Sequence, residues 1–110
     1  MDKLTITIPP KSIYFKSLRL FTASLASDLG FDIEAVEDLR VVVSEACNYK
    51  LSDEDIKVDF EVSERDLTIE VLGKDKALDE TALKMRDLIL EELADEVEIT
   101  EDKIKITKRA

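Results

Sequence analysis

The sequence predicts an α+β fold of two layers, with three helices on one face of a five-stranded sheet that is mixed but mostly antiparallel. Five segments alternate apolar and polar residues with a period of two, as strands with one buried face do. Three longer segments carry apolar residues at three- and four-residue spacing, as amphipathic helices do. Glycine and proline number only two each, which predicts short loops and a single domain over residues 1–110.

The amino-terminal third is expected to form a strand and then two helices. Leu4, Ile6 and Ile8 alternate with polar residues, and the Pro9-Pro10 pair stops that strand. The first helix is expected to end before a glycine at position 30. Its predicted core stripe consists of Tyr14, Leu18, Phe21, Leu25 and Leu29.

The second helix is expected to open at Asp32, whose side chain accepts hydrogen bonds from free N–H groups at the helix start. Glu34, Glu37 and Asp38 suit the positive end of the same helix. The predicted core stripe of this helix consists of Val36, Leu39, Val43 and Ala46.

The remainder is expected to hold two hairpins separated by a third helix. Strands at 56–62 and 67–71 are joined by a polar turn at 63–66, and strands at 96–100 and 103–107 by Glu101-Asp102. The last hairpin should pair Glu and Thr positions with Lys and Thr. The third helical pattern runs from Asp79 to Leu93, and its predicted core stripe consists of Leu78 just before it and Ala82, Met85, Ile89 and Leu93 within it.

Composition excludes several classes of function. The formal net charge of −10 argues against duplex DNA or an anionic membrane as a direct partner. The absence of histidine excludes Ser-His-Asp and Cys-His nucleophiles and removes the commonest metal ligand.

The single cysteine, Cys47, forms no internal disulfide and is expected to be a small buried hydrophobe. No signal-peptide pattern or membrane-length apolar run occurs, so we expect a soluble, cytoplasmic protein. Asp55, Asp59 and Glu61 lack the spacing of a calcium loop, and no metal site is expected.

Three stretches carry a family resemblance. Residues 29–47 contain the end of one predicted helix and most of the next, which includes the sequence Ser-Glu-Ala-Cys. Residues 67–71 read Leu-Thr-Ile-Glu-Val. Residues 93–99 read Leu-Ala-Asp-Glu-Val-Glu-Ile, and 104–108 read Ile-Lys-Ile-Thr-Lys. In order and spacing these stretches resemble the anti-sigma factor serine kinases, which share the GHKL fold of histidine kinase ATPase domains. The resemblance implies a histidine kinase-like ATPase fold over nearly the whole chain.

The resemblance also implies a Mg-ATP site, from which this sequence departs in the second helix. The family has a Glu as general base and, four residues on, an Asn that holds Mg²⁺. Glu45 matches the base, but Tyr49 stands at the Asn position and Asn48 lies one residue early. A shift of one residue turns a side chain by about 100°, which disagrees with the octahedral geometry that Mg²⁺ demands. Glu45 is therefore either a vestigial base or an ordinary helix Glu.

The loop after the third strand departs further. The family's Asp-x-Gly-x-Gly-Phe-Asp binds adenine through its first Asp, and its glycines allow the backbone to approach the nucleotide. The matching segment is 73–79, in which Gly73 replaces the adenine-binding Asp and only Asp79 is kept. Asp75 and Ala77 replace the two glycines.

The last nucleotide motif places glycines at the start of the final helix, with a lid loop before it. Lys84 and Arg86 match those glycines, and the lid is shortened to almost nothing. On a mid-helix surface we expect both side chains to be solvated and to pair with acids such as Asp79 and Asp87.

These departures predict a regulatory protein-binding domain of the anti-sigma type without a cofactor, Mg-ATP included, and without kinase activity. The resemblance implies a sigma factor or an anti-sigma antagonist as partner, and a homodimer as a possible state. Tyr49 and Phe31 are candidate anchors for a partner, or alternatively core residues. The alternatives are an active serine kinase using Asn48, Asp75 and Asp79 in shifted roles, and a structural subunit of a larger complex.

Overall fold

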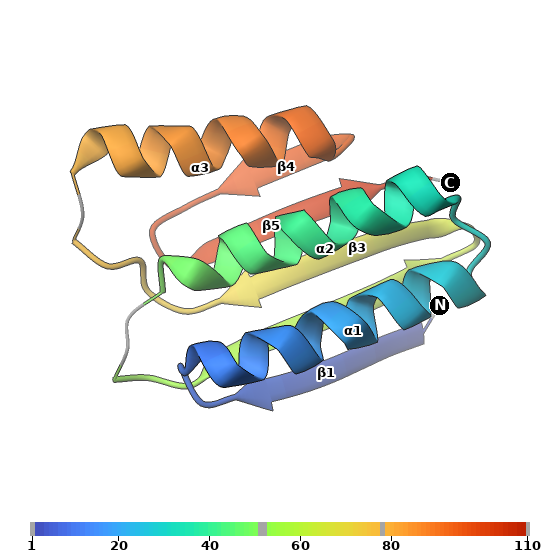
Figure 1. Cartoon of the computed structure of the whole chain (residues 1–110), viewed down its shortest axis with the longest axis horizontal. Helices are drawn as coiled ribbons and strands as arrows, with labels where there is room; N and C mark the ends of the chain where they lie inside the picture. Colours follow the sequence, from blue (N-terminus) through green and yellow to red (C-terminus); the bar gives the residue numbers. More distant parts are fainter. Residues whose placement is uncertain (1, 51–52, 78, 110) are drawn as a thin grey trace.

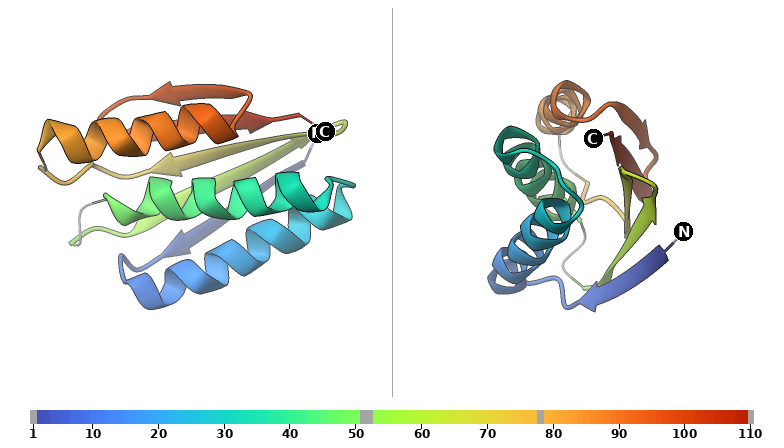
Figure 2. Two further views of the ribbon diagram at one scale, coloured as in Figure 1. Left: turned by 45° about the horizontal axis from the view of Figure 1, so that its top comes forward. Right: turned by 90° about the vertical axis from the view of Figure 1, so that its right-hand side faces the viewer.

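The computed structural model describes residues 2–50, 53–77 and 79–109. Its elements follow the predicted order. They are β1 (Asp2–Ile8), α1 (Ser12–Asp28), α2 (Ile33–Asn48), β2 (Ile56–Ser63), β3 (Asp66–Leu72), α3 (Glu80–Leu93), β4 (Glu96–Ile99) and β5 (Lys103–Lys108). Figure 1 shows the helices lying along the sheet, and the end-on view in Figure 2 shows all three on the same face. The two-layer α+β prediction is confirmed.

The sheet has the strand order β1-β2-β3-β5-β4. The sequence predicts some parallel pairing, but every pair among the described strands is antiparallel. The reason lies in the last hairpin. β4 runs in the same direction as β3 after the α3 crossover, but β5 turns back and lies between them. In that hairpin Glu98 pairs with Lys105 and Glu96 with Thr107, as predicted.

The core lies between the helices and the covered face of the sheet. Most inward-facing apolar residues of the three central strands are fully buried, and Val62 is partly buried. The ring of Phe21 on α1 meets that of Phe60 edge-on, with 5.1 Å between centroids. The opposite face of the sheet carries the alternating polar side chains. The fully buried residues of these strands are Ile56, Val58, Phe60, Leu67, Ile69, Val71, Ile104 and Ile106.

The helix ends form as the sequence predicts. Gly30 has φ +90°, and its N–H donates to the carbonyl of Ser27 while that of Phe31 donates to Ala26, which is the Schellman pattern. The Asp32 carboxylate accepts a 2.8 Å hydrogen bond from the backbone N–H of Ala35 at the start of α2.

The buried face of α1 is rotated by about one residue position from the predicted stripe. Tyr14 is 40% exposed, and the buried positions are Phe15, Leu18, Thr22 and Ala26. The reason is that α1 packs on both the sheet and α2, and small side chains allow that close approach. The α2 stripe is confirmed at Leu39, Val43 and Ala46, with Val36 partly buried.

The face of α3 that packs inward also differs from the prediction. Its buried residues are Arg86 and Leu90, whereas Met85 is 55% exposed. Ala82, Ile89 and Leu93 are half-buried, and Leu78 lies outside the described residues. A charged side chain therefore occupies a position that the apolar pattern assigned to the outside.

Two residues of uncertain role belong to the core. Phe31 is 7% exposed, which makes it a core residue and not a surface anchor. Cys47 is buried, and burial raises the pKa of its thiol to about 12. None of the described helices is long and apolar enough to cross a membrane.

Candidate functional site

Three segments that are far apart in the sequence meet at one end of the sandwich. They are the carboxyl end of α2, the segment 73–77 after β3, and the first half of α3 (Figure 1, left). The backbone N–H of Lys76 donates to the carbonyl of Tyr49 over 2.7 Å, and Lys50 forms an isolated antiparallel bridge with Asp75. Tyr49, the segment 73–77 and the first half of α3, which match parts of the family's three nucleotide motifs, thus lie together in this fold.

A buried ion network occupies this meeting point. Lys50 Nζ donates to Asp75 Oδ1 over 2.8 Å. Arg86 Nη1 lies 3.0 Å from the same oxygen as an ion pair, without hydrogen-bond geometry. The Lys50, Arg86 and Asp75 side chains are 1%, 2% and 9% exposed. Buried charges are tolerated in proteins when they are paired, so Asp75 is what allows both cations to be enclosed here.

Further contacts hold Arg86 in place. Its Nε and Nη2 both lie 2.9 Å from Asp87 Oδ1, and its guanidinium carbon lies 5.9 Å from the centre of the Tyr49 ring. That distance is within the range of a cation–π interaction. The expected Arg86–Asp87 pair is confirmed, but the expected solvated position of Arg86 is wrong. The physical reason is spacing: residue 86 lies four before Leu90, on the face of α3 that packs inward. Lys84 is exposed as predicted.

Glu45 and Asn48 lie on a different side of α2 from this network. Both line a hollow of about 310 Å³ on the outer surface of α1 and α2, together with Arg19 and Ser44. Glu45 is half-buried, and its Oε2 has no hydrogen-bond partner in the described part of the chain. Asn48 is exposed. The structure therefore places the candidate base beside Asn48 but does not join this pair to Asp75.

Tyr49 ends α2, with φ −106° and ψ 12°, and faces Arg86. The residue at the family's Mg²⁺-binding position thus presents an aromatic ring to a guanidinium group. No three His, Cys, Asp or Glu side chains among residues 2–50, 53–77 and 79–109 are grouped closely enough to hold a metal ion.

Gly73 lies beside the Lys50 stem. Its φ is +150°, and its N–H donates to the carbonyl of Asp102 over 2.9 Å. A Cβ added at Gly73 would lie 3.6 Å from Lys50 Cδ, which is ordinary contact. The space next to the position of the family's adenine-binding Asp is therefore filled by the Lys50 side chain.

Asp79 is exposed and caps α3. Its Oδ1 accepts a 2.8 Å hydrogen bond from the backbone N–H of Ala82, and Glu80 follows it in the first turn. The family carries glycines and free N–H groups at the start of this helix, where phosphate binds. Here the same end of the helix is capped by one carboxylate and carries a second, and two negative charges there oppose a bound phosphate.

Sequence reasoning missed Lys50 and misplaced Arg86. The signal for Arg86 was its spacing of four from Leu90 and seven from Leu93. For Lys50 no local pattern exists, because its partner Asp75 is 25 residues away.

Comparisons with known proteins agree with the motif resemblance. No family model matches the chain. The serine-protein kinase RsbW of Listeria innocua is 33% identical over 85 residues, covering 71% of this chain and 54% of that protein. RsbW of Bacillus thuringiensis is 31% identical over 91 residues, covering 77% of this chain and 57% of the other. The chain thus spans about half the length of the curated relatives it matches.

A solved structure supports the fold. The crystal structure of the RsbU and RsbW domains of Rv1364c from Mycobacterium tuberculosis superposes with a TM-score of 0.77. The match covers 99% of this chain and 32% of that chain, at 16% identity. At this identity the likeness establishes the fold alone.

Proposed function

This chain is a homologue of the RsbW serine-protein kinases, the anti-sigma factor kinases of the GHKL family, and we propose that it regulates by binding another protein without ATP. In this proposal the fold of the family is kept as a scaffold for protein contacts. The partner we propose is a sigma factor or an anti-sigma antagonist, and the compartment is the cytoplasm.

The buried network of Lys50, Asp75 and Arg86 is the observation that carries the proposal. Its side chains lie where Tyr49, the segment 73–77 and α3 come together, and both cations are already paired with carboxylates. To bind a triphosphate there, the protein would have to expel two side chains that are 1% and 2% exposed. Expulsion would also leave Asp75 without its partners.

The acidic start of α3 supports the same proposal. Asp79 already takes the N–H of Ala82, and Glu80 adds a second negative charge beside it. A phosphate would have to displace the cap and overcome repulsion from both carboxylates.

The alternative of an active kinase with shifted ligands would need Asn48, Asp75 and Asp79 to act together. One observation favours it, namely the unpartnered Oε2 of Glu45 at the position of the family's general base. Against it, Asp75 is held by two cations and Asp79 by the helix cap. Asn48 lines a separate outer hollow.

The proposal is tested by mixing the purified chain with the sigma factors and anti-sigma antagonists of its own source organism. Complex formation is measured by analytical size-exclusion chromatography and calorimetric titration, with and without 2 mM Mg-ATP. We expect one such partner to bind with an affinity that Mg-ATP changes less than twofold. We also expect no transfer of radiolabelled γ-phosphate to serine.

Two results would contradict the proposal. One is phosphorylation of an antagonist that disappears in Glu45→Ala. The other is a complex that forms only when Mg-ATP is present. A dedicated partner outside the sigma factor and antagonist classes would instead support the structural-subunit alternative.

A further inference from the structure

The outer flank of α3 carries an apolar strip whose most exposed members, Met85 and Leu88, face solvent, while its margin at Leu93 packs against the core. Met85 and Leu88 are 55% and 60% exposed. Together with Ile89, Glu92 and Leu93 they line a hollow of about 450 Å³. Their spacing of three and four residues places them on neighbouring turns of one helix face. We call these five residues the α3 strip.

The rotation of α3 is fixed by its buried residues, so the strip is not a displaced piece of the core. Arg86 and Leu90 face inward, and Arg86 is held there by Asp75 and Asp87. Met85 and Leu88 consequently face solvent. Single exposed apolar residues are common, but a contiguous apolar hollow with a polar rim is typical of an interaction surface.

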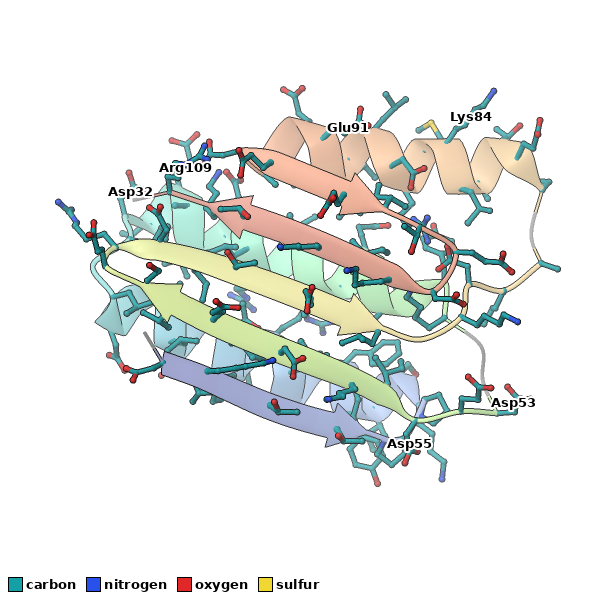
Figure 3. The ribbon with its side chains drawn as sticks, turned by 180° about the vertical axis from the view of Figure 1, so that it is seen from behind. Asp32, Asp53, Asp55, Lys84, Glu91 and Arg109 are labelled. Carbon is teal, nitrogen blue, oxygen red and sulfur yellow. The ribbon has the colours of Figure 1, made fainter. Side chains whose placement is uncertain are left out.

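The rim of the α3 strip is acidic. Glu80, Glu91, Asp95 and Glu96 are exposed on α3 and the segment that follows it, and Lys84 is the exposed cation of the described helix. Figure 3 shows Lys84 and Glu91 on α3 at the margin of the molecule, beside β4. The whole chain carries a net charge of −10. A partner that covers the strip must therefore bring positive charge to its rim.

We propose that the α3 strip docks an amphipathic helix of another protein, with leucine-type side chains on one face and Lys or Arg on both flanks. This inference rests on the proposed protein-binding function and assigns it a surface. A helix laid in an apolar groove is a recurring mode of recognition, with anchors spaced three and four residues apart. A second copy of the chain fits less well, because it would bring a second acidic rim and another −10 of net charge to the same face.

The probe is a fluorescent, amidated peptide of 18 residues, with Leu at helical spacing on one face and Lys elsewhere. A control peptide keeps every Lys and replaces each Leu with Ser. Binding to the full chain is measured by fluorescence anisotropy at 0.15 M salt, where screening weakens purely electrostatic attraction. We expect Leu88→Glu and Met85→Glu each to weaken binding of the Leu-Lys peptide at least tenfold.

Leu20→Glu is the matched control, because Leu20 is 53% exposed and lies on α1, outside the strip. We expect it to change the affinity less than twofold, and we expect ¹H–¹⁵N amide shifts on peptide addition to centre on α3. Circular dichroism and unfolding midpoints confirm that each variant is folded.

Several results would overturn the inference. These are no binding of the Leu-Lys peptide, equal binding of the Ser-Lys peptide, or an equal loss in Leu20→Glu. Self-association that Leu88→Glu abolishes would assign the strip to a second copy and would also overturn it. These readouts are independent of nucleotide. If the peptide does not bind and the chain also binds no nucleotide, only the proposed docking surface is wrong. If the chain binds Mg-ATP, the proposed function is wrong, whether or not the peptide binds.

Discussion

Replacing Asp75 by Asn removes the charge that neutralises two enclosed cations. Lys50 Nζ lies 2.8 Å from Asp75 Oδ1, and no other carboxylate of the described residues forms an ion pair with it. Arg86 keeps its contact with Asp87. Breaking a buried ion pair from one side costs about 3–5 kcal/mol, since the remaining charge stays enclosed without a partner. We expect Asp75→Asn to lower the free energy of unfolding by that amount.

The assay is urea unfolding followed by circular dichroism, with the midpoint and the slope fitted separately. Asp79→Asn is the matched control, because Asp79 is an exposed helix cap and Asn caps a helix about as well as Asp. We expect the control to change stability by less than about 0.5 kcal/mol. A second variant, Asp75→Asn with Lys50→Met, should recover part of the loss because the unpaired ammonium is removed.

A loss below about 1 kcal/mol for Asp75→Asn would refute this reasoning, since that is the range of exposed ion pairs. Such a result would mean that Lys50 and Arg86 reach solvent in solution. The place where the nucleotide motifs meet would then be open.

Two further predictions concern the core and its margins. Gly30→Ala should lower the free energy of unfolding by about 1–2 kcal/mol, because Gly30 has φ +90°. The space for a Cβ is open, so only backbone strain contributes. Urea unfolding measures the loss, and an unchanged midpoint would argue against the left-handed cap. The Cys47 thiol has its pKa raised from 9.0 to about 12 in the folded state, so its contribution to stability is present below pH 9 and is lost as the pH rises toward 12. The stability of the native chain relative to Cys47→Ala should therefore fall by roughly 1 kcal/mol between pH 8 and pH 10. A pH-independent difference would show that the thiol is not buried.

The strands were predictable because period-two alternation is a local signal. Leu67, Ile69 and Val71 alternate with polar residues, and each is fully buried on β3. The helix caps were predictable for the same reason, since Asp32 and Gly30 act within a few residues of their own position. The purely antiparallel pairing was not, because the position of β5 between β3 and β4 depends on how the last hairpin packs.

The buried faces of α1 and α3 were shifted by one residue from the prediction, for different reasons. On α1, Thr22 and Ala26 are buried because the helix packs on a second helix, and neither is a strong hydrophobic signal. On α3, the inward position belongs to Arg86, which hydrophobic periodicity assigns to solvent. Only the tertiary approach of Asp75 makes that position favourable.

The candidate site was predicted in its parts and missed in its arrangement. Tyr49, Gly73 and Asp75 do meet, as the motif positions indicate, but Glu45 and Asn48 face another side of α2. Lys50 and Arg86 connect Tyr49, Gly73 and Asp75, and the ion-pair partners of both cations come from other segments. Charged residues are usually solvated, so their burial follows from pairing in three dimensions and not from their spacing.

The most direct test of the account is thermal unfolding of the chain with and without millimolar Mg-ATP and Mg-ADP, supported by calorimetric titration. A ligand that binds the native state alone at about 100 times its dissociation constant adds about 2.7 kcal/mol, which raises the midpoint by several degrees in a domain of this size. The account predicts no shift and no binding heat for either nucleotide. A saturable shift of several degrees would contradict it, because it would show that the buried network yields to a nucleotide.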